Sequence, residues 1–337
     1  MFDINNNEIS RLCFGTKRIV YIDLMKAIGM YSIVVGHLFP PKNEFIYAFS
    51  VPLFFIISGY LHKKTENNKI FWSKMWYSLL FPSLIFYCLT FIKCLIEEIF
   101  IYNDYQGTFI IYIFRYFIYS ILGFQGENIF VNGGCLGVLW FIYALVLIKV
   151  VYQYINKKIF INIMLVTSIV LTIYWNYNNL FFFNSYASAV VSFPFFYLGS
   201  ILKRYKTNSN NSLYLFLFCG VILYICGHIN GAPFIYKNHC GNNILLFYIG
   251  AISGSIIIYG ISKVLVNYIN YDIVISLSKG NIFILGTHPI IIQLISSTDL
   301  IRTGYFLYVV GAIIYIIYLP IIFFLIKKCP ILLGIKK

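Results

Sequence analysis

Long apolar runs separated by short polar stretches are the dominant pattern of this chain. Ten runs of roughly twenty residues stand out, and each is long enough to cross a hydrocarbon core of about 30 Å as an α-helix. The polar connectors between them, such as HKKTENNK after residue 61, have the composition of loops. The pattern predicts an all-α polytopic membrane protein with about ten transmembrane helices in one bundle. The runs cover residues 20–38, 45–61, 77–101, 136–154, 160–175, 185–202, 213–229, 243–265, 282–297 and 304–326.

A further apolar run lies between the third and fourth predicted spans, within residues 103–135. It reads TFIIYIFRYFIYSILGF at 108–124 and carries Arg115 in its middle, where an arginine is costly inside a bilayer. Counting it as a span would invert every later helix and move the basic clusters at 157–158 and 203–206 to the outer side. We therefore expect an interfacial or re-entrant helix in an outer loop, with an eleventh span as the alternative.

Composition agrees with a membrane protein, and the charge distribution predicts its orientation. Hydrophobic residues make up 60% of the chain and charged residues 11%, a balance that excludes ordinary soluble domains. With the N-terminus in the cytoplasm, 19 Lys and Arg residues fall on the inner side and four on the outer side, as the positive-inside rule predicts. The net charge of +14 therefore indicates orientation and not a nucleic-acid surface. We expect cytoplasmic segments, including both termini, at residues 1–18 and 327–337 around a membrane domain at 19–326.

The first apolar run, YIDLMKAIGMYSIVVGHLF at 21–39, carries three ionisable side chains. An α-helix turns about 100° per residue, so Lys26 and His37 lie on one face, about 16 Å apart along the axis. Asp23 precedes Lys26 by three residues, which allows an ion pair. Ionisable groups inside a membrane are functional candidates, and a histidine titrates near neutral pH. The alternative is that Asp23 and Lys26 only reach toward the cytoplasmic headgroups.

Five segments of the chain resemble a known family. YIDLMKAIGMYSIVVGHLF, FSVPLFFIISGYLHKK, GVLWFIYALVLIK, FPFFYLGSILKR and LSKGNIFILGTHPIII occur in this order. They resemble the acyltransferase 3 family of bacterial membrane O-acyltransferases, in its fucose-acetylase-like and exopolysaccharide acetyltransferase branch. The resemblance implies a multi-pass protein of the bacterial plasma (inner) membrane. Such a protein would move an acyl group, usually acetyl, from cytoplasmic acyl-CoA to a hydroxyl of a surface polysaccharide or lipid-linked sugar.

The resemblance also implies roles for the first-span residues. The first-helix motif of the family is a basic residue, ten others and a histidine, which maps onto Lys26 and His37. His37 would be the general base, or alternatively the carrier of a transient acyl group, and Asp23 would hold Lys26. The family more often has arginine at the Lys26 position, and its paired arginines after the second span are matched only loosely by Lys69 and Lys74.

The acyl donor would bind through positive charge at the cytoplasmic side. Lys26 and the cluster Lys63, Lys64 and Lys74 are expected to attract the phosphates of acetyl-CoA. Plain signalling of topology is the alternative for that cluster. We expect acyl-CoA to act as a co-substrate and no metal to take part, since no C-x-x-C pair occurs in the sequence.

Three further residues are candidates for binding the acceptor. His288 precedes a helix-kinking Pro289 in the ninth run, Trp140 lies in the first turns of the fourth predicted span, and Glu98 lies near the outer loop. A buried structural histidine and a packing aromatic are the alternatives for the first two. The expected partners are acyl-CoA, a saccharide acceptor and the lipid bilayer. The competing function is a membrane exporter of a glycan or acylated precursor.

Overall fold

A computed structural model describes residues 18–101, 117–124, 137–180, 182, 184–204, 213–296 and 304–335. Within these residues the chain is helical, and one π-helical turn at Trp76–Leu80 joins α3 to α4. The helices are α1 (Val20–Gly36), α2 (Asn43–Leu61), α3 (Asn68–Met75), α4 (Phe81–Ile101), α6 (Trp140–Tyr154), α7 (Lys158–Tyr177), α8 (Ser185–Leu202), α9 (Leu213–Asn230), α10 (Ile244–Leu265), α11 (Tyr271–Ser296) and α12 (Phe306–Lys328).

All ten predicted spans coincide with helices, so the all-α polytopic prediction is confirmed. Among the described residues, eight helical stretches have at least 18 residues and are apolar enough to cross a membrane, with α3, the π turn and α4 counted as one. A slightly shorter apolar helix runs from Tyr214 to Asn230 in α9, and α1 has 17 residues. The described helices therefore have the lengths and composition of a polytopic membrane protein.

Two predicted boundaries are wrong, because capped polar turns precede the apolar run. The third helical stretch begins at Asn68 instead of residue 77, where the Asn67 side chain accepts a hydrogen bond from the Ile70 N–H at 3.2 Å. The ninth span begins at Tyr271 instead of residue 282, and Asn270 caps it by accepting from the Asp272 N–H at 2.9 Å. A capping asparagine satisfies backbone donors that would otherwise remain unpaired.

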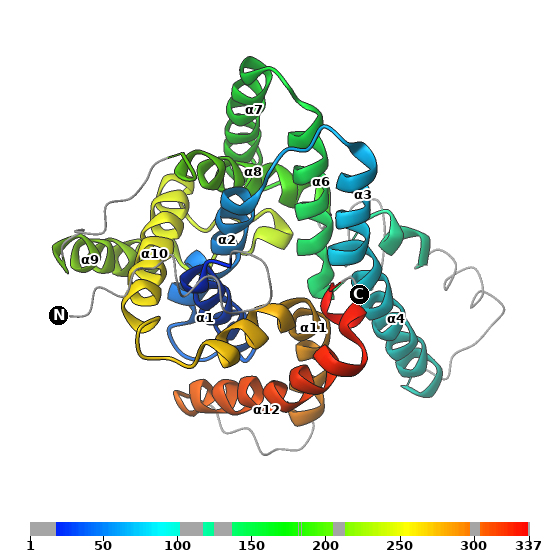
Figure 1. Cartoon of the computed structure of the whole chain (residues 1–337). Helices are drawn as coiled ribbons and strands as arrows, with labels where there is room; N and C mark the ends of the chain where they lie inside the picture. The colour runs from blue at the N-terminus through cyan, green and yellow to red at the C-terminus, as the bar shows by residue number, and fades with distance from the viewer. Residues whose placement is uncertain are drawn as a thin grey trace.

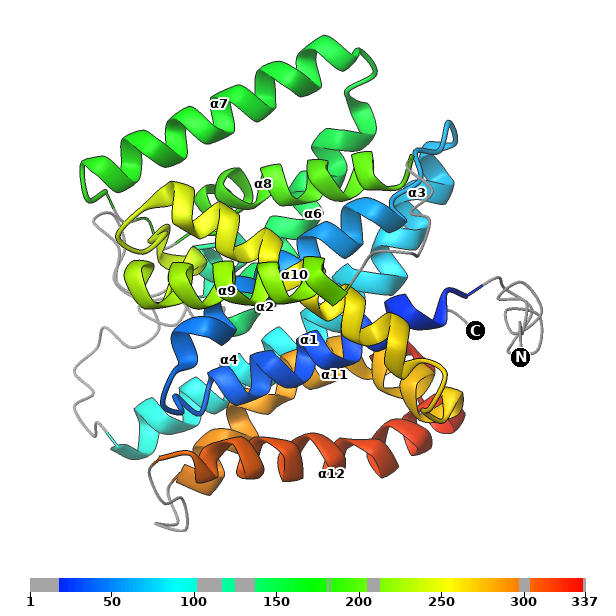
Figure 2. The same ribbon diagram turned by 90° about the vertical axis from the view of Figure 1, so that its left-hand side faces the viewer.

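The helices surround a central pair, α1 and α2 (Figure 1). α1 packs against α2, α10, α11 and α12, whereas α7 packs mainly against α8. Figure 2 shows α7 at one edge of the bundle and α12 at the opposite edge. The ionisable first helix is therefore enclosed by other helices, which is the position that its polar face requires in a bilayer.

The contacts between loops fall into two groups, one at each end of the bundle. At one end the Lys203 amine donates to the His62 carbonyl at 2.7 Å, and the Lys64 amine donates to the Ile155 carbonyl. At the other end the Ser185 N–H donates to the Gly123 carbonyl at 2.9 Å. The first group contains only loops predicted to be cytoplasmic, and the second only loops predicted to be outside. The first turn of α1 and the end of α12 lie at the same end of the bundle (Figure 2).

The predicted outer loop at 103–135 lies largely outside the described residues. Its described part, residues 117–124, includes a helical turn whose Phe117 ring lies 5.4 Å from the ring of Phe91 on α4. Gly123 then contacts the start of α8. The interfacial or re-entrant helix therefore stays a prediction.

The helices α2 and α8 meet backbone to backbone. A Cβ atom added to Gly59 would lie 1.9 Å from the carbonyl oxygen of Phe196, and one added to Gly199 would lie 1.9 Å from that of Ile56. Only glycine permits such an approach. The contact brings the C-terminal ends of α2 and α8 together.

Candidate functional site

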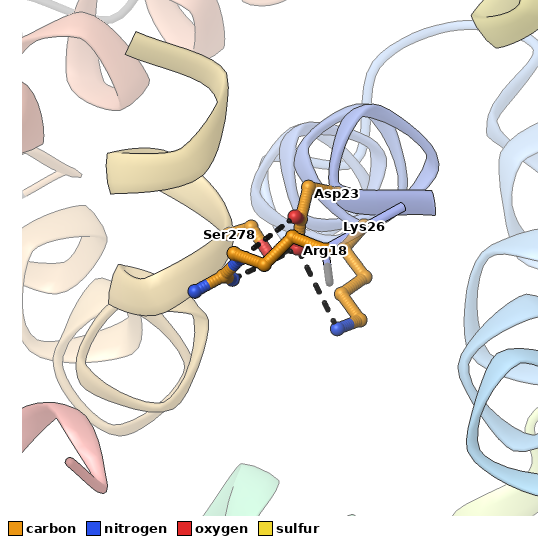
Figure 3. A network of polar contacts seen from close by, with 4 residues as sticks. All are labelled: Arg18, Asp23, Lys26 and Ser278. Carbon is orange, nitrogen blue, oxygen red and sulfur yellow. Dashed lines mark hydrogen bonds and ion pairs between the residues drawn. The ribbon is translucent and has the colours of Figure 1, made fainter. Parts of the chain in front are cut away.

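The carboxylate of Asp23 is the centre of a polar network at the start of α1 (Figure 3). Asp23 is only 4% exposed. The Arg18 guanidinium donates to it through Nε at 3.0 Å and Nη2 at 3.1 Å, and Ser278 of α11 donates through its hydroxyl at 2.5 Å. The Lys26 amine lies 3.8 Å from the same carboxylate. Arg18 and Ser278 thus hold the carboxylate by hydrogen bonds, and Lys26 is attracted to it by charge.

Arg18 is a site residue that sequence reasoning missed. Its position just before the first span led us to treat it only as an orientation charge, and Asp23 was expected to pair with Lys26. The fork of the guanidinium matches a carboxylate bidentately, which an ammonium cannot do. A basic residue five positions before a buried acid was the signal available in the sequence.

Arg18 and Ser278 donate the hydrogen bonds to Asp23, so Lys26 pairs with this carboxylate by charge alone, at 3.8 Å. Its side chain is 24% exposed, and in Figure 3 its amine extends away from Ser278. The charge on Lys149 of α6 lies close enough to interact with that on Lys26. Two cations therefore interact electrostatically inside the bundle, and the sequence had indicated only Lys26 as a site residue.

Two histidines meet near the other end of α1. His37 follows the last residue of α1, and His288 lies in α11 immediately before Pro289. Their rings contact edge to face, with 4.8 Å between centroids, and His288 is fully buried. The α1–α11 contact therefore joins Asp23 to Ser278 at one end and His37 to His288 at the other.

Each histidine is fixed in one tautomer by a backbone carbonyl. The Nδ1 atom of His37 lies 2.9 Å from the Ile33 carbonyl oxygen, and Nδ1 of His288 lies 2.9 Å from that of Ile284. A carbonyl only accepts hydrogen bonds, so Nδ1 carries the hydrogen and Nε2 carries the lone pair of the neutral ring. The Nε2 atom of His288 is buried and has no hydrogen-bond partner in the part of the chain that is described. In both rings, Nε2 is therefore the nitrogen that can accept a proton.

An open cavity of about 680 Å³ adjoins His37. This volume falls within the range of about 300–1,000 Å³ that is typical of small-molecule sites. The half-buried imidazole of His37 is therefore accessible to a ligand, while His288 lies behind it. The cavity is lined by His37, Leu38, Phe39, Pro40, Pro41, Lys42, Asn43, Ile292, Gly304 and Leu307.

The remaining predicted site residues are dispersed. Trp140 is buried against the rings of Phe141 and Tyr236, at 6.2 and 6.4 Å, and is not among the residues that line this cavity. The side chain of Glu98 lies outside the described residues.

The predicted donor cluster divides between two places. Lys64 lies at the junction of α2 and α6, and Lys63 interacts electrostatically with Lys203 near that junction. Lys74, with Lys69, lines a different pocket of about 480 Å³. Lys74 therefore contributes to a surface that the other members of the predicted cluster do not line.

Within the described part of the chain, no group of three or more His, Cys, Asp and Glu residues could hold a metal ion. The arrangement instead offers an accessible imidazole base at one end of α1 and uncompensated positive charge at the other.

A family model described as an acyltransferase domain matches residues 19–325. No curated protein and no solved structure matches the chain. Because the match covers nearly the whole chain and every helix of the bundle, this membrane protein belongs to the acyltransferase 3 family.

Proposed function

We propose that the protein transfers an acetyl or other short acyl group from acyl-CoA to a hydroxyl of a surface polysaccharide or lipid-linked sugar. The observation that carries this proposal is the state of His37. Its Nδ1–H is held by the Ile33 carbonyl, its Nε2 retains the lone pair, and it lines an open cavity. An imidazole held in this way is a general base.

The proposed reaction uses His37 twice. Nε2 removes the proton from the acceptor hydroxyl while the hydroxyl oxygen forms a bond to the acyl carbon. The C–S bond of the thioester then breaks, and the departing CoA thiolate takes the proton from the His37 imidazolium. The imidazole returns to its starting state, so no metal or redox step is needed.

His288 has a supporting role in this proposal. Its ring contacts the ring of His37 edge to face and holds that imidazole in position beside the cavity, where the reacting hydroxyl would bind. Aligning two reactants removes much of the entropic barrier to their reaction.

The donor enters from the predicted cytoplasmic end. Lys26 and the nearby lysines attract the phosphates of CoA, and the thioester arm follows the face of α1 toward His37, about 16 Å along the axis. The bacterial plasma membrane is the expected location, with the saccharide reaching His37 from the cavity side. The match to an acyltransferase family favours this reaction over the export of a glycan.

Replacement of the base tests the proposal. We expect His37→Gln to lower the rate of acetyl transfer from acetyl-CoA by at least about 10²-fold, because general-base catalysis contributes roughly 10²–10⁴-fold. The purified protein would be assayed in detergent with radiolabelled acetyl-CoA and an extracted saccharide acceptor.

His228→Gln is the matched control, because His228 is exposed on α9 and its replacement should leave the rate unchanged. Normal transfer by His37→Gln would rule out His37 as the base. Release of intact glycan without any consumption of acetyl-CoA would favour an exporter.

A further inference from the structure

His62, directly after the end of α2, has an environment that the proposed reaction does not explain. Its ring contacts Tyr152 of α6 and Phe196 of α8 edge to face, with centroids 5.5 and 5.6 Å away. The Nε2 atom is buried and has no hydrogen-bond partner among the described residues. A buried polar atom without a partner costs about 1–3 kcal/mol, so this position is one where a ligand would be stabilised.

Positive charge surrounds this ring on several sides. Burial lowers the pKa of His62 to about 4, and the charges of Lys149, Lys203 and Lys64 contribute further. Lys149 also interacts electrostatically with Lys26 of α1. We call these residues the inner cation cluster: Lys26, His62, Lys64, Lys149 and Lys203.

Few carboxylates lie near the positive charges of the inner cation cluster. Lys203 donates to the His62 carbonyl at 2.7 Å, and Lys64 donates to the Ile155 carbonyl and lies 5.1 Å from the Tyr152 ring centroid. These groups hold the lysines but do not neutralise them. In the described part of the chain, Lys64, Lys149 and Lys203 have no carboxylate within ion-pair distance, and Asp23 is already bound by Arg18. Like charges gathered without counter-ions repel one another unless an anion binds between them.

We propose that the inner cation cluster is a binding site for a phosphodiester or diphosphate-diester anion, with Lys149 and His62 as its inner anchors. Such an anion presents several oxygens and would supply the missing negative charge and the missing partner of His62 Nε2. Two sources share this chemistry, the diphosphate of the acyl donor and the phosphate of an anionic lipid. Only the first source rests on the proposed transfer reaction.

Binding at this site is coupled to a proton. An anion beside the ring favours the imidazolium form, so it raises the pKa of His62 above its value of about 4 in the free protein. The bound state then holds more protons than the free state, and affinity rises as the pH falls. The groups facing His62 are Lys149 and Tyr152 of α6, Lys203 of α8 and Lys64 on its own segment. The proton taken up on binding is assigned to Nε2 of His62.

The test is direct binding to the full chain in a neutral detergent. ADP-ribose represents a soluble diphosphate diester, and dioctanoyl phosphatidylglycerol represents the lipid headgroup. We expect saturable binding of at least one ligand, tighter at about pH 5.5 than at about pH 7.5. Lys149→Gln should weaken it about tenfold or more, whereas Lys158→Gln, at an exposed lysine on α7, should leave it unchanged. His62→Asn should reduce the pH dependence.

The binding results distinguish a soluble ligand from a lipid and show whether the site exists. Binding of ADP-ribose that Lys149→Gln weakens supports the site and a soluble source. Binding of phosphatidylglycerol alone, weakened by the same change, supports the site and a lipid source. The proposal is overturned if neither ligand binds saturably, or if Lys149→Gln and Lys158→Gln have equal effects. Because binding is measured without turnover, it can fail while transfer by His37 persists, and the reverse also holds.

Discussion

At the scale of single residues, the polar groups of α1 are fixed by partners on other helices. Ser278 donates to Asp23, Tyr315 of α12 donates to the Ala27 carbonyl at 2.8 Å, and His288 contacts His37. The Ile33 carbonyl fixes the tautomer of His37 from within the same turn. Since an unpaired polar group inside a membrane protein is costly, these contacts determine both the position of α1 and the chemistry of its histidine.

The Asp23 network supplies a prediction about stability. Asp23→Asn removes the charge that binds Arg18 in two hydrogen bonds and attracts Lys26. We expect a loss of about 1.5–3 kcal/mol in the free energy of unfolding, the range for hydrogen bonds to charged groups. Thermal unfolding in detergent would measure it.

Ser278→Ala is the companion variant, since it removes one donor and leaves the ion pairs in place. Its effect should be smaller than that of Asp23→Asn. An Asp23→Asn protein as stable as the parent would show that the network contributes nothing to folding.

At the scale of helices, the contact between α2 and α8 sets a strict steric limit. Gly199→Ala places a Cβ atom where the Ile56 carbonyl oxygen lies 1.9 Å away, and a backbone atom cannot rotate aside. We expect a loss of at least about 1–3 kcal/mol, the usual cost of overpacking. It would be measured as a lower thermal midpoint or a loss of monodisperse protein.

Gly220→Ala serves as the control, because an added Cβ on this α9 residue meets nothing within 4 Å. Alanine is the better helix former by up to about 1 kcal/mol, so this variant should be as stable as the parent or slightly more stable. Equal effects of both substitutions would contradict the close packing of α2 on α8.

The helices could be predicted from the sequence more completely than the site. Apolar runs of membrane-spanning length give the helices directly, and the spacing of Lys26 and His37 is a property of one helix. The contact between His37 and His288 joins residues far apart in the chain, so local patterns contain no information about it. The polar turns before α3 and α11 were missed because Asn67 and Asn270 act through backbone hydrogen bonds. Lys149 was read only as a topology signal because its neighbours come from other helices.

At the scale of the whole molecule, loop contacts divide the bundle into two ends that agree with the charge bias. The junctions of His62 with Lys203 and of Lys64 with Ile155 lie at the end rich in lysine. The positive-inside rule assigns this end to the cytoplasm. The cavity beside His37 then opens on the outer side, so donor and acceptor would approach α1 from opposite faces of the membrane.

Cysteine labelling tests this orientation. α7 begins at Lys158 and ends at Tyr177, and both residues are exposed. In a background with the eight native cysteines changed to serine, a membrane-impermeant maleimide should label Tyr177→Cys in intact cells. Lys158→Cys should react only after the membrane is permeabilised. The reverse pattern would place the lysine-rich end outside.

The pairing of Asp23 with both Arg18 and Ser278 has a consequence for biosynthesis. Ser278 follows Asp23 by 255 residues, and at about 5–20 residues per second the ribosome needs roughly 13–50 s to produce it. The first helix therefore enters the bilayer long before α11 exists. Arg18 lies only five residues from Asp23 and emerges with it, so it can neutralise the carboxylate during this interval. Arg18 thus offsets the charge of Asp23 until Ser278 of α11 has been synthesised.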